Sequence, residues 1–135
     1  MLKIDFARGA GIVLLFTLLG SPATAGDVRH LTIPKAVWGT WALKPDQCAA
    51  NDASLISIRE GGGTGPEDNC AVEYVVETAG AAGPIYSAHM LCTEKDNPAK
   101  SSNKAFIVIP RGDDAISIGS GFDDLKTYYR CPKSN

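Results

Sequence analysis

The chain has 135 residues, and its 13 basic and 15 acidic side chains give a formal net charge of −2. Charges of both signs alternate along it without a block of Lys or Arg. This argues against nucleic acid and anionic membranes as partners, because phosphate groups are bound by clustered basic side chains. The length suits a single domain with a modest core, in which covalent cross-links would contribute strongly to stability.

Residues 1–25 have the pattern of a secretory signal peptide. Lys3 and Arg8 precede a short apolar run, and an A-x-A sequence ends at Ala25. The run is shorter than the ~20 apolar residues that a membrane-spanning helix needs. We therefore predict cleavage near Ala25 and a mature domain of residues 26–135 without a membrane anchor, located in the periplasm or outside the cell. Without the signal peptide the net charge becomes −3.

Residues 26–35 form a polar stretch that we interpret as a lead-in arm. Beyond it, seven short segments alternate apolar and polar residues or are rich in β-branched and aromatic ones, which is typical of strands. The predicted strands are 37–43, 54–59, 70–78, 85–92, 105–109, 115–118 and 126–131. Segments rich in Gly, Pro, Asp and Asn separate them. Helical structure is expected only as single turns, at 47–50 and 66–69.

About seven short strands without helical crossovers predict an all-β, antiparallel domain. Seven strands must close on themselves or stack in two layers to protect their edges. We favour a small up-and-down barrel or flattened barrel of about seven to eight strands with two disulfides. A sandwich is the alternative.

The four cysteines, Cys48, Cys70, Cys92 and Cys131, all lie beyond the predicted cleavage site. If the third and fourth strands form a hairpin, opposed positions sum to about 163, so Cys70 faces position 93, beside Cys92. Neighbouring positions on paired strands lie near the separation that a disulfide prefers. We therefore predict the bond Cys70–Cys92, which leaves Cys48–Cys131 to tie the first strand to the last. In an exported protein, structural disulfides are favoured over a metal or redox site.

The first predicted strand contains Trp38-Gly39-Thr40-Trp41. Its Gly39-x-Trp41 resembles the G-x-W signature of lipocalin-like (calycin) barrels. The resemblance implies that Gly39 permits a close approach and that Trp41 plugs one end of the barrel. It also implies a cavity for a small ligand, although the match covers these two residues only.

Two further resemblances concern classes of protein. A G-T-W strand followed by spaced cysteines resembles small exported β-barrel proteins of α-proteobacteria, and this similarity implies no functional residue. Size, compartment and cysteine use are also similar to periplasmic inhibitors of c-type lysozyme, which insert a Ser-Gly…Tyr loop into the enzyme cleft. The nearest counterpart is the loop Ser120, Gly121, Phe122, Asp123 and Asp124, where the aromatic residue and its spacing differ.

Catalytic and metal-binding patterns are weak. His30 lies in the predicted arm and His89 on a strand, without a neighbouring nucleophile motif. The paired aspartates at 113–114 and 123–124 lack the spacing of a calcium loop, so we interpret them as solvated turn residues. We predict no catalytic residue, no metal site and no cofactor.

These observations favour an exported, non-enzymatic binding or interaction module that presents the loops 61–69, 96–103 and 119–124 to an unknown protein or small ligand. A lysozyme inhibitor, a calycin-like carrier of a small ligand and an enzyme whose site is not visible in sequence stay open as alternatives. An open barrel mouth lined by Trp and Tyr would favour the small ligand, and a filled barrel with an apolar surface patch would favour a protein partner.

Overall fold

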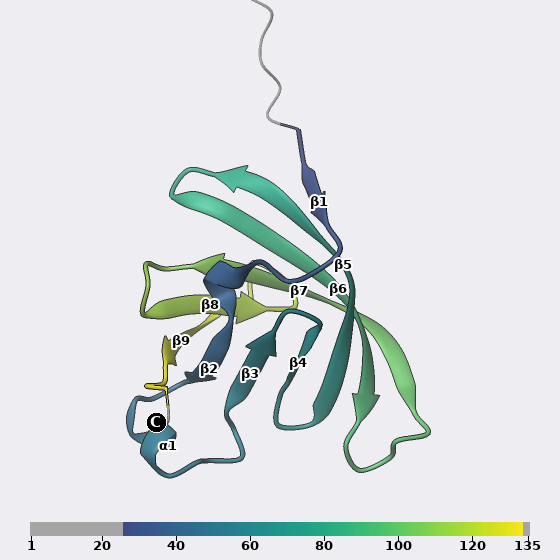
Figure 1. Ribbon diagram of the computed structural model, residues 1–135, viewed down its shortest axis with the longest axis vertical. Helices are drawn as coiled ribbons and strands as arrows, with labels where there is room; N and C mark the ends of the chain where they lie inside the picture. Colours follow the sequence, from purple (N-terminus) through teal and green to yellow (C-terminus); the bar gives the residue numbers. More distant parts are fainter. Residues whose placement is uncertain (1–25, 134–135) are drawn as a thin grey trace, which may run out of the picture.

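A computed structural model describes residues 26–133 and shows an all-β protein (Figure 1). Its described elements are β1 (Val28–His30), η1 (Lys35–Val37), β2 (Gly39–Ala42), α1 (Asp46–Ala49), β3 (Ile56–Arg59), β4 (Gly62–Thr64), β5 (Asp68–Gly80), β6 (Gly83–Glu94), β7 (Ser101–Pro110), β8 (Ala115–Gly119) and β9 (Lys126–Arg130). The predicted signal peptide lies outside the described residues.

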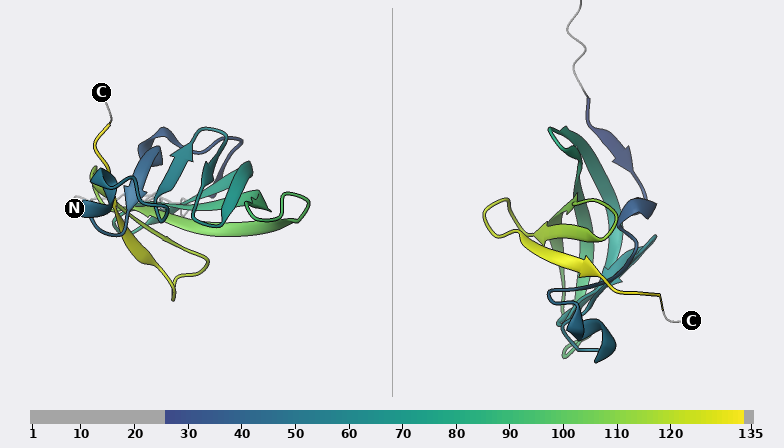
Figure 2. Two further views of the ribbon diagram at one scale, coloured as in Figure 1. Left: turned by 90° about the horizontal axis from the view of Figure 1, so that it is seen from below. Right: turned by 90° about the vertical axis from the view of Figure 1, so that its left-hand side faces the viewer.

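Eight consecutive antiparallel strands, β2 to β9, form a closed up-and-down barrel, and β1 adds to the edge of β5 as one extra strand. The barrel closes through the pairing of β2 with β9. The all-β barrel prediction is therefore confirmed, and the sandwich alternative is not. The long hairpin of β5 and β6 runs well past the shorter strands and carries β1 on its protruding part (Figure 2).

The closing junction of the barrel is short. Only Trp41 and Ala42 of β2 have partners in β9, namely Arg130 and Tyr129. The disulfide Cys48–Cys131 lies directly beyond this junction and joins α1 to the chain after β9. Figure 1 shows the described C-terminal end beside α1. The predicted bond between the first and last barrel strands is confirmed.

The second disulfide, Cys70–Cys92, joins two residues that are directly opposite on β5 and β6. Between Tyr74 and the hairpin turn, the residue numbers of opposed positions sum to 163, as expected. A β-bulge at Glu73 lowers this sum to 162 for the pairs between Asp68 and Val72. The disulfide was therefore predicted correctly, although Cys70 is opposite Cys92 and not opposite position 93. The bulge also corrects the assumed alternation, because Val72 packs against the core while the next buried residue of β5 is Val75.

Two strands of the structure were not predicted from the sequence. Residues 28–30 of the predicted arm form β1, and residues 62–64 of a predicted contact loop form β4. The glycines of β4 allow close strand packing, since a Cβ at Gly62 would overlap the carbonyl oxygen of Cys70. The helical turn near residues 47–50 is confirmed as α1, whereas the one predicted at 66–69 is wrong, because β5 begins at Asp68.

The core is a single apolar cluster inside the barrel. Its fully buried members are Trp41, Ile116, Val37, Val75 and Cys92. The 3-10 turn η1 contacts both β3 and β7, which lie four strands apart in the ring of eight, so it crosses the interior at one end. Val37 of η1 is 1% exposed and its carbonyl accepts a 3.1 Å hydrogen bond from Trp41 Nε1. This end of the barrel is therefore closed.

Candidate ligand cavity

The opposite end of the barrel is surrounded by four connections. Because the strands alternate in direction, the segments between β2 and β3, β4 and β5, β6 and β7, and β8 and β9 all lie at this end. Strand β2 enters the barrel from η1, so this end is the one away from η1. We call it the open end.

A cavity of about 310 Å³ lies inside the barrel at the open end. Its apolar wall comes from inward-facing residues of β3, β5, β6, β7 and β8. They are Ile56, Ile58, Cys70, Met90, Phe106, Val108 and Ile118. The rim on one side is the turn into β5, formed by residues 64–68. The volume is at the lower limit of small-molecule pockets in proteins, ~300 Å³.

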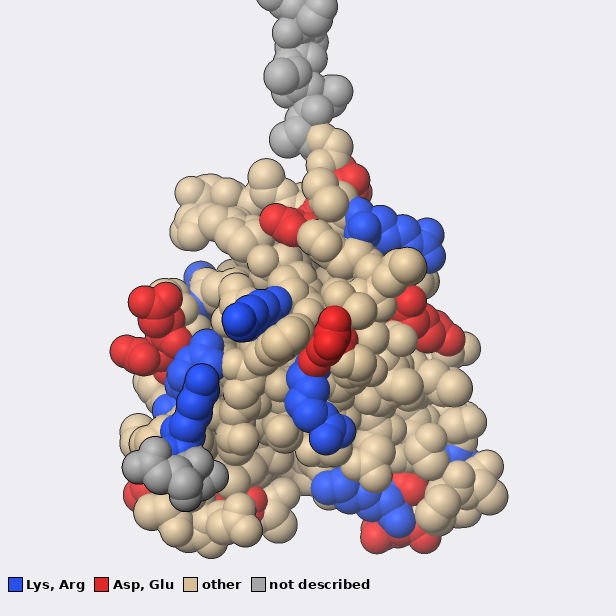
Figure 3. Space-filling view, viewed as in Figure 1, with Lys and Arg blue, Asp and Glu red and all other residues tan. Residues whose placement is uncertain are grey.

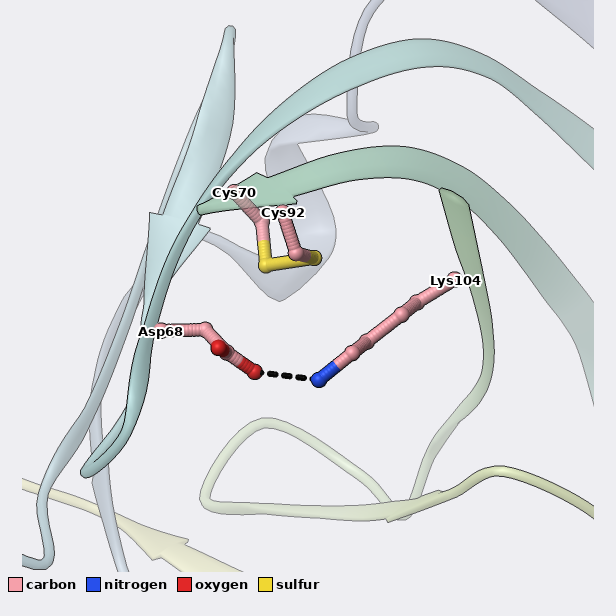
Figure 4. The surroundings of a disulfide bond; sticks show 4 residues. All are labelled: Asp68, Cys70, Cys92 and Lys104. Atoms are coloured by element: carbon pink, nitrogen blue, oxygen red, sulfur yellow. Dashed lines mark hydrogen bonds and ion pairs between the residues drawn. A yellow bond between two sulfur atoms is a disulfide. The ribbon is translucent and has the colours of Figure 1, made fainter. Parts of the chain in front are cut away.

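An ion pair lies at the rim of this cavity. Asp68 and Lys104 lie on β5 and β7, the two neighbours of β6, and the Nζ–Oδ2 distance is 2.6 Å. Figure 4 shows the two side chains pointing toward one another near the Cys70–Cys92 disulfide. The Asp68 side chain is 16% exposed and lines the cavity, whereas that of Lys104 is 40% exposed. The carboxylate is thus the inner partner.

The predicted contact loop also lies at the open end. Asp124 accepts hydrogen bonds from the Gly121 amide at 2.7 Å and from both the amide and the hydroxyl of Ser120. The bond from the Ser120 hydroxyl, with a further one from the Gly121 amide, lowers the pKa of Asp124. The loop is therefore internally braced. It presents Phe122, which is 65% exposed, next to Asp123.

The G-x-W residues lie at the closed end. Trp41 is fully buried, and the guanidinium of Arg130 lies over its ring. Gly39 has φ +144°, and a Cβ there would lie 2.8 Å from Nη1 of Arg130. The glycine therefore leaves space for the guanidinium. The plug role of Trp41 stays a prediction.

The two histidines lie outside the cavity. His30 on β1 contacts Glu77 at 2.6 Å. His89 stacks on Tyr74, with ring centroids 4.3 Å apart, and its Nε2 lies 3.4 Å from the hydroxyl of Ser87. Arg29 covers the other side of this stack at 3.8 Å from the Tyr74 centroid. Among the described residues, the hydrogen bonds of His89 include no carboxylate.

The surface charges are mixed on the face in Figure 3, where basic and acidic side chains are spread over a largely uncharged surface. Within residues 26–133, no group of three or more His, Cys, Asp or Glu side chains is placed to share a metal ion. Across the same residues, no helix is both long and apolar enough to span a membrane.

The resemblance to lipocalin-like barrels implied a cavity, but the residues that line it and the ion pair were not predicted from sequence. A signal existed in the two-residue period of the strands, since Asp68 is two residues before Cys70 and Lys104 two residues before Phe106. Both charges are therefore on the interior face of their strands. Recognising them as partners requires the register of β5, β6 and β7 together.

Searches against models of protein families, curated proteins and solved structures found no match to this chain.

Proposed function

We propose that this protein is an exported, non-enzymatic binding protein that holds a small, mainly apolar molecule in the open end of its barrel. The observation that carries the proposal is the apolar cavity of about 310 Å³ among Ile56, Met90, Phe106 and Ile118. Water occupies ~30 Å³ per molecule in the liquid, so this space suits a ligand of about ten non-hydrogen atoms. Burial of apolar ligand surface would supply the binding free energy.

The export part of the proposal is supported by the cysteines. The described chain has two disulfides and no free thiol, which is compatible with an oxidising compartment. We expect processing near Ala25. N-terminal sequencing of the protein from the periplasmic fraction of a bacterial host should find Gly26 as the first residue. A protein that keeps its N-terminus and remains in the cytoplasm would contradict this part.

The binding test uses 1-naphthalenemethanol, a neutral probe of matching size, and isothermal titration calorimetry. We expect saturable binding of one probe molecule per folded chain. Met90 and Leu91 are neighbours on β6, but Met90 lines the cavity and Leu91 is 42% exposed. Met90→Trp should therefore weaken binding about ten-fold or more by filling the cavity, while the matched control Leu91→Trp should bind as the parent does. Equal binding by both variants, or no saturable binding, would overturn the proposal.

A second candidate is a protein partner at the same end of the barrel. The exposed Phe122, held on a braced acidic loop, favours this alternative, because aromatic residues often anchor protein interfaces. The predicted lysozyme inhibitor is its specific form. Excess mature protein should slow lysis of a peptidoglycan suspension by c-type lysozyme, and Phe122→Ala should abolish the effect. Unchanged lysis by the parent protein would end this candidate.

A further inference from the structure

We infer that the ligand of the cavity is an apolar amine, whose ammonium group binds Asp68 in place of Lys104. This inference rests on the proposed function and adds the charge of the ligand. Lys104 does not line the cavity, but its ammonium group lies against the carboxylate of Asp68, which does, and a ligand ammonium could take the same place.

The polarity of the cavity supports a cation. Among the described residues that line it, Glu67 and Asp68 are acidic and none is basic. A carboxylate in a largely apolar site is stable only with a paired charge or hydrogen bonds. At present Lys104 provides the pair to Asp68, at 2.6 Å. A ligand ammonium at the same place would keep the Asp68 carboxylate paired.

The two partners differ in how easily they can leave. The side chain of Asp68 is short and 16% exposed. Its main chain is held in β5, where the Asp68 carbonyl accepts a 2.9 Å hydrogen bond from the amide of Gly65. Lys104 is 40% exposed and reaches the site from β7 by a flexible stem. On release, Lys104 would regain solvent and conformational freedom, because a lysine loses much rotamer entropy when held.

An anionic ligand does not fit the site as well. An anion in the cavity would meet Glu67 and Asp68, which line it, before Lys104, which does not. It would also bring a third negative charge close to Glu67 and Asp68, and like charges at short range disfavour the ionised forms.

The test compares three probes that share one ring system: 1-naphthylmethylamine, 1-naphthalenemethanol and 1-naphthoate. Calorimetric titration of the parent protein at neutral pH should show the amine binding most tightly and the carboxylate most weakly. Lys104→Met should strengthen amine binding about ten-fold, because the internal competitor is gone. Asp68→Asn should reduce amine affinity to that of the alcohol. Both variants should bind the alcohol within about three-fold of the parent.

A matched control is Lys100→Met. Lys100 pairs with Glu94 at 2.8 Å in a second, more exposed ion pair, and neither residue lines the cavity. Lys100→Met removes a positive charge near the same end of β7 as Lys104→Met does. Because Lys100 does not contact Asp68 or the cavity, amine binding should not change. Circular dichroism and the count of intact disulfides would establish that each variant is folded.

The outcomes separate the two claims. If the alcohol does not bind, the proposed function fails. If the alcohol binds and the amine binds no better, or Lys104→Met leaves amine affinity unchanged, the inference of an amine fails alone. If the carboxylate binds most tightly and loses affinity in Lys104→Met, the site selects an anion and the inference is overturned.

Discussion

The guanidinium of Arg130 lies over the indole ring of Trp41, with its Cζ 4.1 Å from the ring centroid. The same guanidinium donates hydrogen bonds to the carbonyls of Ala36, Trp38 and Asp113. Arg130 is thus connected to η1, the chain entering β2, and the turn between β7 and β8. One side chain joins the closed end of the barrel to the junction of β2 and β9, where only two residue pairs meet.

We expect Arg130→Met to lower the free energy of unfolding by about 2–3 kcal/mol, through loss of charged hydrogen bonds and of the cation–π contact. Arg59→Met is the matched control, because Arg59 is exposed on β3 and surface changes of this kind stay within about 0.5 kcal/mol. Urea denaturation followed by tryptophan fluorescence would measure both variants. Equal unfolding free energies of the two variants would show that Arg130 does not connect the closed end of the barrel to the β2–β9 junction.

Elements that carry a side-chain pattern were predictable from the sequence. Alternation identified strands such as β6, and the hairpin geometry identified the partner of Cys70. Strand β4 carries no such pattern, because two of its three residues are glycine and its structure comes from close backbone packing with β3 and β5. A run of glycines in a sequence predicts a flexible loop unless the neighbouring strands are known.

The candidate site was harder to predict because it depends on register. The bulge at Glu73 changes which residues of β5 face the interior, and sequence periodicity does not mark a single inserted residue. Asp68 and Lys104 are 36 residues apart and meet only because β5 and β7 both pair with β6. In contrast, the loop ending at Asp124 was predicted as a connection between strands from its composition, and its hydrogen bonds are local. Its role as a contact loop came from the resemblance to lysozyme inhibitors and stays a prediction.

Gly62 offers a direct test of the close packing of β4. It has φ +156°, and a Cβ there would overlap the carbonyl of Cys70, so Gly62→Ala must displace backbone. We expect a loss of about 3 kcal/mol or more in unfolding free energy. Gly61→Ala, one residue earlier, is the control, since a Cβ at that position meets nothing within 4 Å. Chemical denaturation of the two variants should differ clearly, and similar losses would contradict the packing.

The Cys48–Cys131 disulfide should be the main support of the short β2–β9 junction. It closes 83 residues, for which the chain-entropy model gives about 4.5 kcal/mol, against about 3.4 kcal/mol for a separation of 22. We expect Cys48→Ala/Cys131→Ala to be strongly destabilised. Amide hydrogen exchange should rise first at Trp41, Ala42 and Arg130. Equal loss of protection across β5 and β6 would show that the junction has no separate dependence on this bond.

Asp124 should make the order of the contact loop depend on pH. Its pKa is lowered chiefly by the Ser120 hydroxyl, so the carboxylate stabilises the folded loop at any pH above the ordinary aspartate pKa. This contribution is lost as the pH falls through the lowered value. NMR should show the amide signals of Ser120 and Gly121 shifting together with the Asp124 carboxyl signal, at a pH below that of a free aspartate. Asp124→Asn should shift these amides already at neutral pH, and the neighbouring Asp123→Asn is the control that should not. Titration of the two amides at the ordinary aspartate pKa would contradict the bracing of the loop by Asp124.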